Sequence, residues 1–232
     1  MTILIIHGSP RKNGCSSNIA LNIASEFKAD KLLEINLQKE NLPYCAGCLN
    51  CVNKGIEYCS HSDITLSMRD KMLEADLIII AVPVYILHMS GQLKTFIDHF
   101  PSIFLMHRPE KLMFNKQLII VATAAGPVCR QTLKEIKECF TYFGVSKIYE
   151  LGIGVHAKDF KSMPEKKIQE VAKKSKAIIK KVKKEKNKHK VAFKIRSNFL
   201  LYRMIQKKFS PSKIDHQYWL DNNWFDNGRP WK

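Results

Sequence analysis

The chain has 232 residues, of which 45% are hydrophobic and 25% charged, proportions typical of a globular protein rather than a disordered one. Its longest apolar run, residues 77–87, is too short to cross a membrane, and no basic segment precedes the first apolar stretch as it would in a secretory signal. We therefore expect a cytoplasmic protein whose 7 cysteines are thiols or metal ligands rather than disulfides.

Strand-length apolar runs alternate with helix-period segments along most of the chain. The expected strands are residues 2–6, 33–37, 77–82, 117–123 and 147–153, and the expected helices are residues 19–27, 91–100, 133–143 and 165–182. This alternation predicts an α/β fold of three layers, with a five-stranded parallel sheet covered by helices on both faces. Ligands of such sheets bind at the carboxyl ends of the strands, so the candidate site lies in the loops 8–18, 83–91 and 123–130.

The net charge of +17 is concentrated near the C-terminus. Residues 1–160 hold 17 Lys and Arg against 15 Asp and Glu, whereas residues 161–232 hold 21 against 6. We predict a core domain, residues 1–185, and a basic helical and aromatic C-terminal extension, residues 186–232. We favour an extension with a solvated helix face and a strap that packs on the core or on a second subunit. The alternative is a basic amphipathic segment that binds a membrane, nucleic acid or an acidic partner.

The loop after the first expected strand is rich in groups that bind phosphate. Hydroxyl, amide and guanidinium donors are concentrated there: Ser9, Arg11, Ser16, Ser17 and Asn18. A following helix would add the free backbone N–H groups of its N-terminus. The loop contains neither the Walker lysine nor a G-x-G-x-x-G fingerprint, so it suits a phosphate monoester better than a triphosphate or a dinucleotide. An ordinary helix N-cap would explain one serine but not the cluster.

The loop after the third expected strand offers a surface for a flat ring. Pro83 stiffens the end of the strand, and Tyr85 presents an apolar face with a polar tip. The alternative is that this segment only closes a buried strand.

Four cysteines follow the compact pattern C-x2-C-x2-C-x7-C, namely Cys45, Cys48, Cys51 and Cys59. Thiolates at this spacing can converge on one side of a tight loop, and the spacing is more typical of an iron–sulfur cluster than of zinc. Three interpretations stay open: a [4Fe–4S] cluster, free thiols in a turn-rich loop, and a zinc site. We expect Cys129 and Cys139 to be structural, because small buried thiols are common.

Together these segments resemble the family of NAD(P)H-dependent FMN reductases and iron–sulfur flavoproteins. The matching segments, in the order and spacing of the family, are Gly8-Ser9-Pro10-Arg11-Lys12-Asn13-Gly14, Cys45-Ala46-Gly47-Cys48-Leu49-Asn50-Cys51, and residues 83–98 from Pro83 to Asp98. The resemblance covers about residues 1–155. It implies a flavodoxin-like fold with strand order 2-1-3-4-5 and FMN as cofactor. The residues that would bind FMN are Ser9, Arg11, Ser16, Ser17, Asn18, Pro83, Val84, Tyr85, Ile86, Thr123, Ala124 and Gly126.

The resemblance also implies an oxidoreductase in which NAD(P)H, as cosubstrate, reduces bound FMN, which passes electrons to a small acceptor such as a quinone or a flavin. The alternative is an iron–sulfur flavoprotein that relays electrons through FMN and a [4Fe–4S] cluster to ferredoxin-like partners. No catalytic side chain is expected, because the cofactor carries the chemistry, and we interpret His88 as a surface histidine. We expect a homo-oligomer and no nucleic-acid partner, and a peripheral membrane contact stays open.

Overall fold

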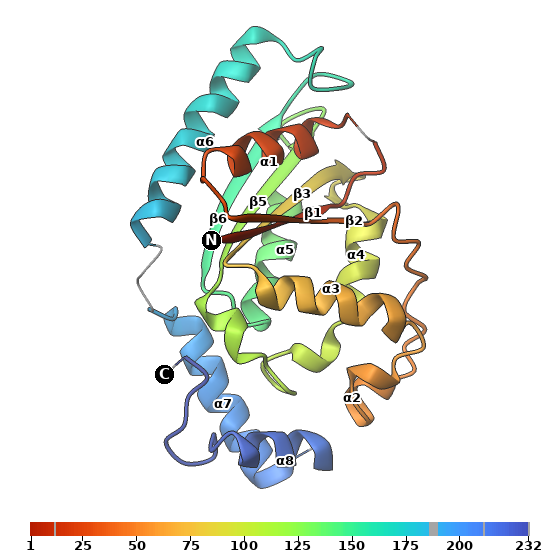
Figure 1. Ribbon diagram of the computed structural model, residues 1–232, viewed down its shortest axis with the longest axis vertical. Helices are drawn as coiled ribbons and strands as arrows, with labels where there is room; N and C mark the ends of the chain where they lie inside the picture. The colour runs from red at the N-terminus through yellow and green to blue at the C-terminus, as the bar shows by residue number, and fades with distance from the viewer. Residues whose placement is uncertain (12, 186–189, 211, 232) are drawn as a thin grey trace.

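A twisted parallel sheet forms the centre of the molecule (Figure 1). The computed structural model describes residues 1–11, 13–185, 190–210 and 212–231. The strands are β1 (Thr2–His7), β2 (Lys31–Asn36), β3 (Leu77–Tyr85), β5 (Gln117–Ala124) and β6 (Lys147–Gly154), with the short β4 (His88–Met89) paired antiparallel to β3. The parallel strands lie in the order β2-β1-β3-β5-β6. This confirms the five predicted strands and the flavodoxin-like order.

Helices cover both faces of the sheet, as predicted. One face packs against α1 (Cys15–Ser25) and α6 (Glu165–Glu185), and the other against α3 (Ser62–Glu74), α4 (Gly91–Asp98) and α5 (Arg130–Tyr142). Alternate side chains of one strand serve the two cores: Ile3 and Ile5 point to the first, Leu4 and Ile6 to the second. All four are fully buried. Because both faces of a central parallel strand are covered, its sequence is a continuous run of apolar residues.

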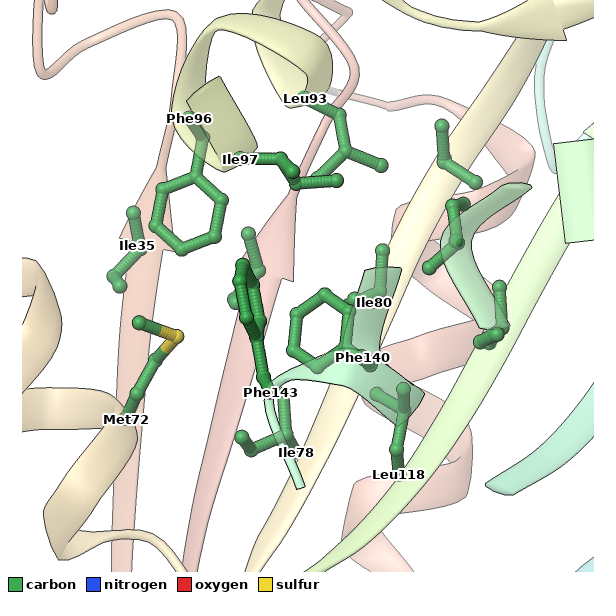
Figure 2. Packing of buried hydrophobic residues seen from close by; sticks show 14 of the residues in the cluster. Ile35, Met72, Ile78, Ile80, Leu93, Phe96, Ile97, Leu118, Phe140 and Phe143 are labelled. Atoms are coloured by element: carbon green, nitrogen blue, oxygen red, sulfur yellow. The ribbon is translucent and has the colours of Figure 1, made fainter. Parts of the chain in front are cut away.

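The core on the second face is aromatic at its centre. Figure 2 shows Phe140 and Phe143 directed at Ile78 and Ile80 of the sheet, with Phe96 beside them. The rings of Phe140 and Phe143 meet edge to face with their centroids 5.4 Å apart. This packing holds α4 and α5 in place. The loop after β3 leads into α4 and the loop after β5 leads into α5, so these two loops of the candidate site are anchored.

The structure differs from the sequence-based expectation before β3. Helix α3 was not among the predicted helices, because its buried residues Thr65, Met68 and Met72 form a weakly apolar stripe in a polar segment. Short helical turns also occur around the cysteine motif and after α4: α2 (Asn50–Asn53) and the 3₁₀ helices η1 (Ile56–Tyr58), η2 (Pro101–Ile103) and η3 (Lys111–Asn115).

The C-terminal extension contains two helices, α7 (Phe193–Phe209) and α8 (Lys213–Asp221), which lie at one end of the core (Figure 1). Phe199, Trp219 and Trp224 form a buried cluster of their own, and the rings of Phe199 and Trp219 stack 4.8 Å apart. Ile195 joins α7 to the core through Leu105 and Phe114. The extension is thus helical and aromatic as predicted. Residues 186–189, at the proposed boundary, lie outside the described residues, so the division at residue 185 stays a prediction.

No helix within the described ranges is both long enough and apolar enough to span a membrane.

Gly154, the last residue of β6, makes a close approach that generates a testable prediction. A Cβ at this position would lie 2.8 Å from the carbonyl carbon of Gly126 and 2.9 Å from its oxygen, so backbone would have to move. We expect Gly154→Ala to lower the free energy of unfolding by about 1–3 kcal/mol, measured by denaturant titration. Gly126→Ala is the matched control, because a Cβ at Gly126 would meet no atom within 4 Å. Equal losses in the two variants would contradict the close approach.

Candidate functional site

The three loops selected from the sequence meet at the carboxyl edge of the sheet, because β1, β3 and β5 are parallel and end together. They enclose a cavity of about 250 Å³. Its lining residues are Ser9, Arg11, Gly14, Cys15, Ser16, Pro83, Val84, Tyr85, Thr123, Ala124, Ala125, Val155, Ala157 and Lys158. A larger groove of about 780 Å³ lies between α5 and α6. It is lined by Pro127, Cys129 and Arg130 of the loop 123–130 but by no residue of the other two loops, so we do not assign it to the cofactor.

One end of the cavity has the features of an anion site. Helix α1 begins after Gly14, and no side chain among the described residues caps it. The backbone N–H groups of its first turn therefore point at the cavity together with the helix dipole. Arg11 also lines the cavity, and its guanidinium donates to the carbonyl of Lys158, another lining residue, at 3.3 Å. Lys12 of the same motif lies outside the described residues.

The backbone at this end of the cavity is closely packed against neighbouring side chains. A Cβ at Gly14 would lie 3.1 Å from Ser9 Oγ, and a Cβ at Gly8 would lie 3.2 Å from Ser90 Oγ. Ser90 is fully buried and donates to the carbonyl of Gly8 at 2.6 Å while it caps α4. The loop after β1 is thus fixed against the segment after β3. Uncapped N–H groups, serine hydroxyls and a guanidinium around a close-packed turn suit a phosphate group.

Two residues predicted for the phosphate lie beside the cavity instead of lining it. Ser17 Oγ is 3.1 Å from Nδ1 of His7, whose Nε2 is 2.8 Å from a carboxylate oxygen of Glu34. The Asn18 side chain donates to the carbonyl of Gly14 at 3.0 Å. Both side chains therefore stabilise the turn before and within α1, and neither residue lines the cavity.

The other end of the cavity is lined by the ends of two neighbouring strands. Pro83, Val84 and Tyr85 come from the end of β3, and Thr123 and Ala124 come from the end of β5, where Thr123 pairs with Pro83. Tyr85 is half-exposed at the rim. These strand ends offer aliphatic and aromatic side chains against which a planar ring can pack.

Two further predicted residues, Ile86 and Gly126, do not line the cavity. Ile86 is 91% exposed at the tip of the β3–β4 turn, where Ile86 and Leu87 both have positive φ, 46° and 68°. Gly126 adjoins the lining residue Ala125 without lining the cavity itself. His88 follows the turn and pairs with Glu135 at 2.6 Å on the surface.

The sequence did not single out the lining residues that follow β6, namely Val155, Ala157 and Lys158. The signal was available, because the strand that pairs with β5 must end at the same edge of the sheet. The sequence-based expectation covered only the loops after the first, third and fourth strands.

The four motif cysteines Cys45, Cys48, Cys51 and Cys59 line one small cavity of about 30 Å³ together with His61, His99 and Pro101. All four are free thiols. Burial raises the pKa of the Cys51 thiol, and the nearby sulfurs of Cys59, Cys45 and Cys48 raise it further. Four thiol sulfurs around one cavity are the donor type that a sulfur-ligated metal centre uses, so the donor set fits such a centre.

A pair of histidines beside these cysteines was not predicted. His99 Nδ1 donates to the carbonyl of Thr95 at 2.8 Å, which leaves its Nε2 as an acceptor 3.1 Å from Nδ1 of His61. Ligand atoms of Cys59, His61 and His99 lie within 4.8 Å of one another. Nitrogen atoms at this separation suit a hydrogen bond and also suit two ligands of one metal ion, so the zinc interpretation stays open.

Comparison with known proteins agrees with this geometry. The family model described as NADPH-dependent FMN reductase matches residues 1–148. An iron–sulfur flavoprotein of Clostridioides difficile is 28% identical over 180 residues, which cover 75% of this chain and 77% of the relative. An iron–sulfur flavoprotein of Archaeoglobus fulgidus is 28% identical over 154 residues, which cover 65% and 67% of the two chains.

Solved structures agree on the fold. The azoreductase AzrA has a TM-score of 0.59 and 19% identity over 79% of this chain and 100% of its own. An FMN-dependent NADH-azoreductase from Bacillus anthracis, solved with FMN, has a TM-score of 0.57 and 13% identity over 77% and 100%. The family match over more than half of the chain establishes that this protein is an oxidoreductase of the NADPH-dependent FMN reductase family with a flavodoxin-like fold.

Proposed function

We propose that the protein binds FMN in the cavity at the carboxyl edge of the sheet and uses NAD(P)H to reduce it, with a small acceptor such as a quinone or a flavin receiving the electrons. The observation that carries this proposal is the convergence of three loops on one cavity with an uncapped helix at its end. Ser9, Arg11, Ser16 and the first-turn N–H groups of α1 would hold the phosphate. Pro83, Val84, Tyr85, Thr123 and Ala124 would flank the ring.

The protein's own groups have the tasks of binding, orientation and access. When bound, FMN supplies the hydride and electron chemistry, so the chain needs no catalytic base. Thr123 and Ala124 are buried where they line the cavity, whereas Tyr85 is half-exposed. A nicotinamide and the later acceptor would therefore reach the ring from the side of Tyr85.

The cysteine site favours a second candidate, an iron–sulfur flavoprotein that relays electrons between FMN and a [4Fe–4S] cluster. Its support is the gathering of Cys45, Cys48, Cys51 and Cys59 around one cavity. The relatives from C. difficile and A. fulgidus carry that name. The partners would then be ferredoxin-like proteins. A reducing, cytoplasmic location and a homo-oligomeric state belong to both candidates.

Arg11 provides the test of the phosphate end. We expect Arg11→Ala to raise the apparent Kd for FMN about tenfold or more, because a charged hydrogen bond to the phosphate is lost, as measured by quenching of flavin fluorescence. Riboflavin, which lacks the phosphate, should bind wild type and variant equally. Arg69→Ala is the control, since Arg69 lies on α3 and pairs with Asp70. An unchanged FMN affinity would mean that Arg11 is only solvated.

The second candidate is tested by the absorption spectrum of protein purified without air, with iron, sulfide and zinc measured on the same sample. We expect flavin absorbance with stoichiometric iron and sulfide, and the loss of most iron and sulfide in Cys59→Ser because one ligand is removed. Cys139→Ser is the control, since Cys139 lies on α5 outside the cysteine cavity. Flavin without iron in the wild type would leave the FMN reductase alone. Neither chromophore after FMN is added would contradict both candidates.

A further inference from the structure

The C-terminal extension holds a short segment of the core, residues 106–109, by its main chain. Gln206 donates to the carbonyl of Met106 at 2.6 Å, Trp219 Nε1 donates to that of His107 at 2.6 Å, and Tyr218 donates to that of Pro109 at 3.0 Å. These three donors come from α7 and α8. The segment that they fix contains one long charged side chain, Arg108.

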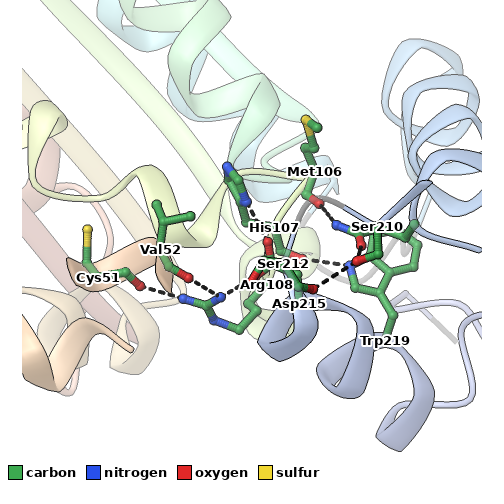
Figure 3. A network of polar contacts seen from close by, with 10 residues as sticks. Cys51, Val52, Met106, His107, Arg108, Ser210, Ser212, Asp215 and Trp219 are labelled. Atoms are coloured by element: carbon green, nitrogen blue, oxygen red, sulfur yellow. Dashed lines mark hydrogen bonds and ion pairs between the residues drawn. The ribbon is translucent and has the colours of Figure 1, made fainter. Parts of the chain in front are cut away.

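Arg108 connects the extension to the cysteine loop. Its Nη2 donates to the carbonyl of Cys51 at 2.5 Å and its Nη1 to that of Val52 at 2.9 Å. The same guanidinium is paired with Asp215 of α8. Figure 3 shows Arg108 lying between the two cysteine-loop carbonyls and the Asp215 carboxylate.

Asp215 is fully buried, and its charge is compensated from two sides. One oxygen accepts from Arg108 and the other lies 2.7 Å from Nδ1 of His107. Charge-assisted bonds in a site without solvent are strong and directional, and losing one partner leaves the other unpaired at high cost. The direction of the Arg108 side chain therefore depends on Asp215.

The cysteine loop contains little regular structure, although Cys51 and Val52 are buried. Helix α2, which contains Cys51, has only four residues and begins after Leu49 in the left-handed region, with φ of 58°. Cys45 and Cys48 are exposed, so they contribute no buried packing. The carbonyls at the end of so short a helix have few partners within it, and Arg108 supplies the donors.

We infer that Asp215 and Arg108 are positioning residues of the cysteine site: Asp215 fixes Arg108, and Arg108 fixes the main chain at Cys51 and Val52 and with it the Cys51 sulfur. The basic extension thereby stabilises the conformation of the cysteine loop. We call this network of Asp215, Arg108 and the two loop carbonyls the brace. The inference rests on the proposed metal site for its purpose, but the brace itself is defined in metal-free protein.

The experiment compares the full-length chain with Asp215→Asn, which removes the charge with little change of shape. In metal-free protein, the rate at which a maleimide labels each cysteine is followed by peptide mass spectrometry. Labelling of the buried Cys51 should become about tenfold faster or more, because the loop opens locally once Arg108 is released. Labelling of Cys129, buried under the sheet, should not change. Asp226→Asn, an exposed carboxylate of the same extension 3.8 Å from Lys207, is the matched control and should behave like wild type.

A second variant, Arg108→Lys, retains a cation beside Asp215 but cannot donate to both carbonyls as the guanidinium fork does. It should also accelerate the labelling of Cys51, and it replaces Asp215→Asn if that variant does not fold. The second readout is iron and sulfide per chain after anaerobic reconstitution, which should fall by about half or more in both variants while the FMN affinity stays unchanged.

The outcomes separate the brace from the cluster proposal. Faster labelling of Cys51 in the variants, together with a wild type that takes up no iron, would support the brace and contradict the cluster. Cys51 labelling and iron content equal to wild type would overturn the inference, since the network would then only join the extension to the core. Equal acceleration at Cys129 would also overturn it, because the effect would be general unfolding.

Discussion

The parallel pairing of β3 with β1 and β5 is the constraint on which the site depends. In this register His7 lies beside Ala81 and Pro83 beside Thr123, and Gly8 donates to the carbonyl of Ala81 at 2.8 Å as the chain leaves the sheet. Because side chains alternate between faces, a slip of one residue would exchange the two cores and turn these loops away from one another. Continuous burial of both faces makes that slip costly, so the apolar strands determine where the loops meet.

Most of the binding capacity of the cavity comes from the backbone rather than from charged side chains. The uncapped start of α1 offers N–H groups that no sequence change short of proline can remove, and Arg11 adds the charge. The core domain is nearly neutral over residues 1–160, with 17 basic against 15 acidic residues. In the proposed function, attraction of an anionic cofactor would therefore be local, through the helix dipole and the cavity residues Arg11 and Lys158, rather than through the overall field of the domain.

The sequence predicts the parts of this molecule whose causes are local. Unbroken apolar runs predict the strands, and hydroxyl donors before a helix predict the phosphate end. It does not give the direction of a side chain within a loop, which is why Ser17, Asn18 and Ile86 were grouped with neighbours that line the cavity. Helix α3 was missed because its apolar stripe is weak. The histidine pair was missed because His61 and His99 are 38 residues apart in the sequence, and only the packed structure brings them together.

In the C-terminal extension, the residues that dominate the composition differ from the residues that attach it to the core. Its basic residues were the signal in the sequence, yet its position depends on apolar and aromatic groups: all 3 tryptophans of the chain lie there, and Trp219 and Trp224 are buried. The ammonium groups of the lysines stay in solvent, while the aromatic side of each helix packs inward. The net charge of a segment therefore describes its exposed residues and not its buried ones. Asp215, a buried carboxylate of this segment, is paired with Arg108 across 107 residues. Burying this charge between the extension and the cysteine loop is costly, and apolar packing alone would attach α8 at lower cost. The buried ion pair therefore indicates that the contact is specific.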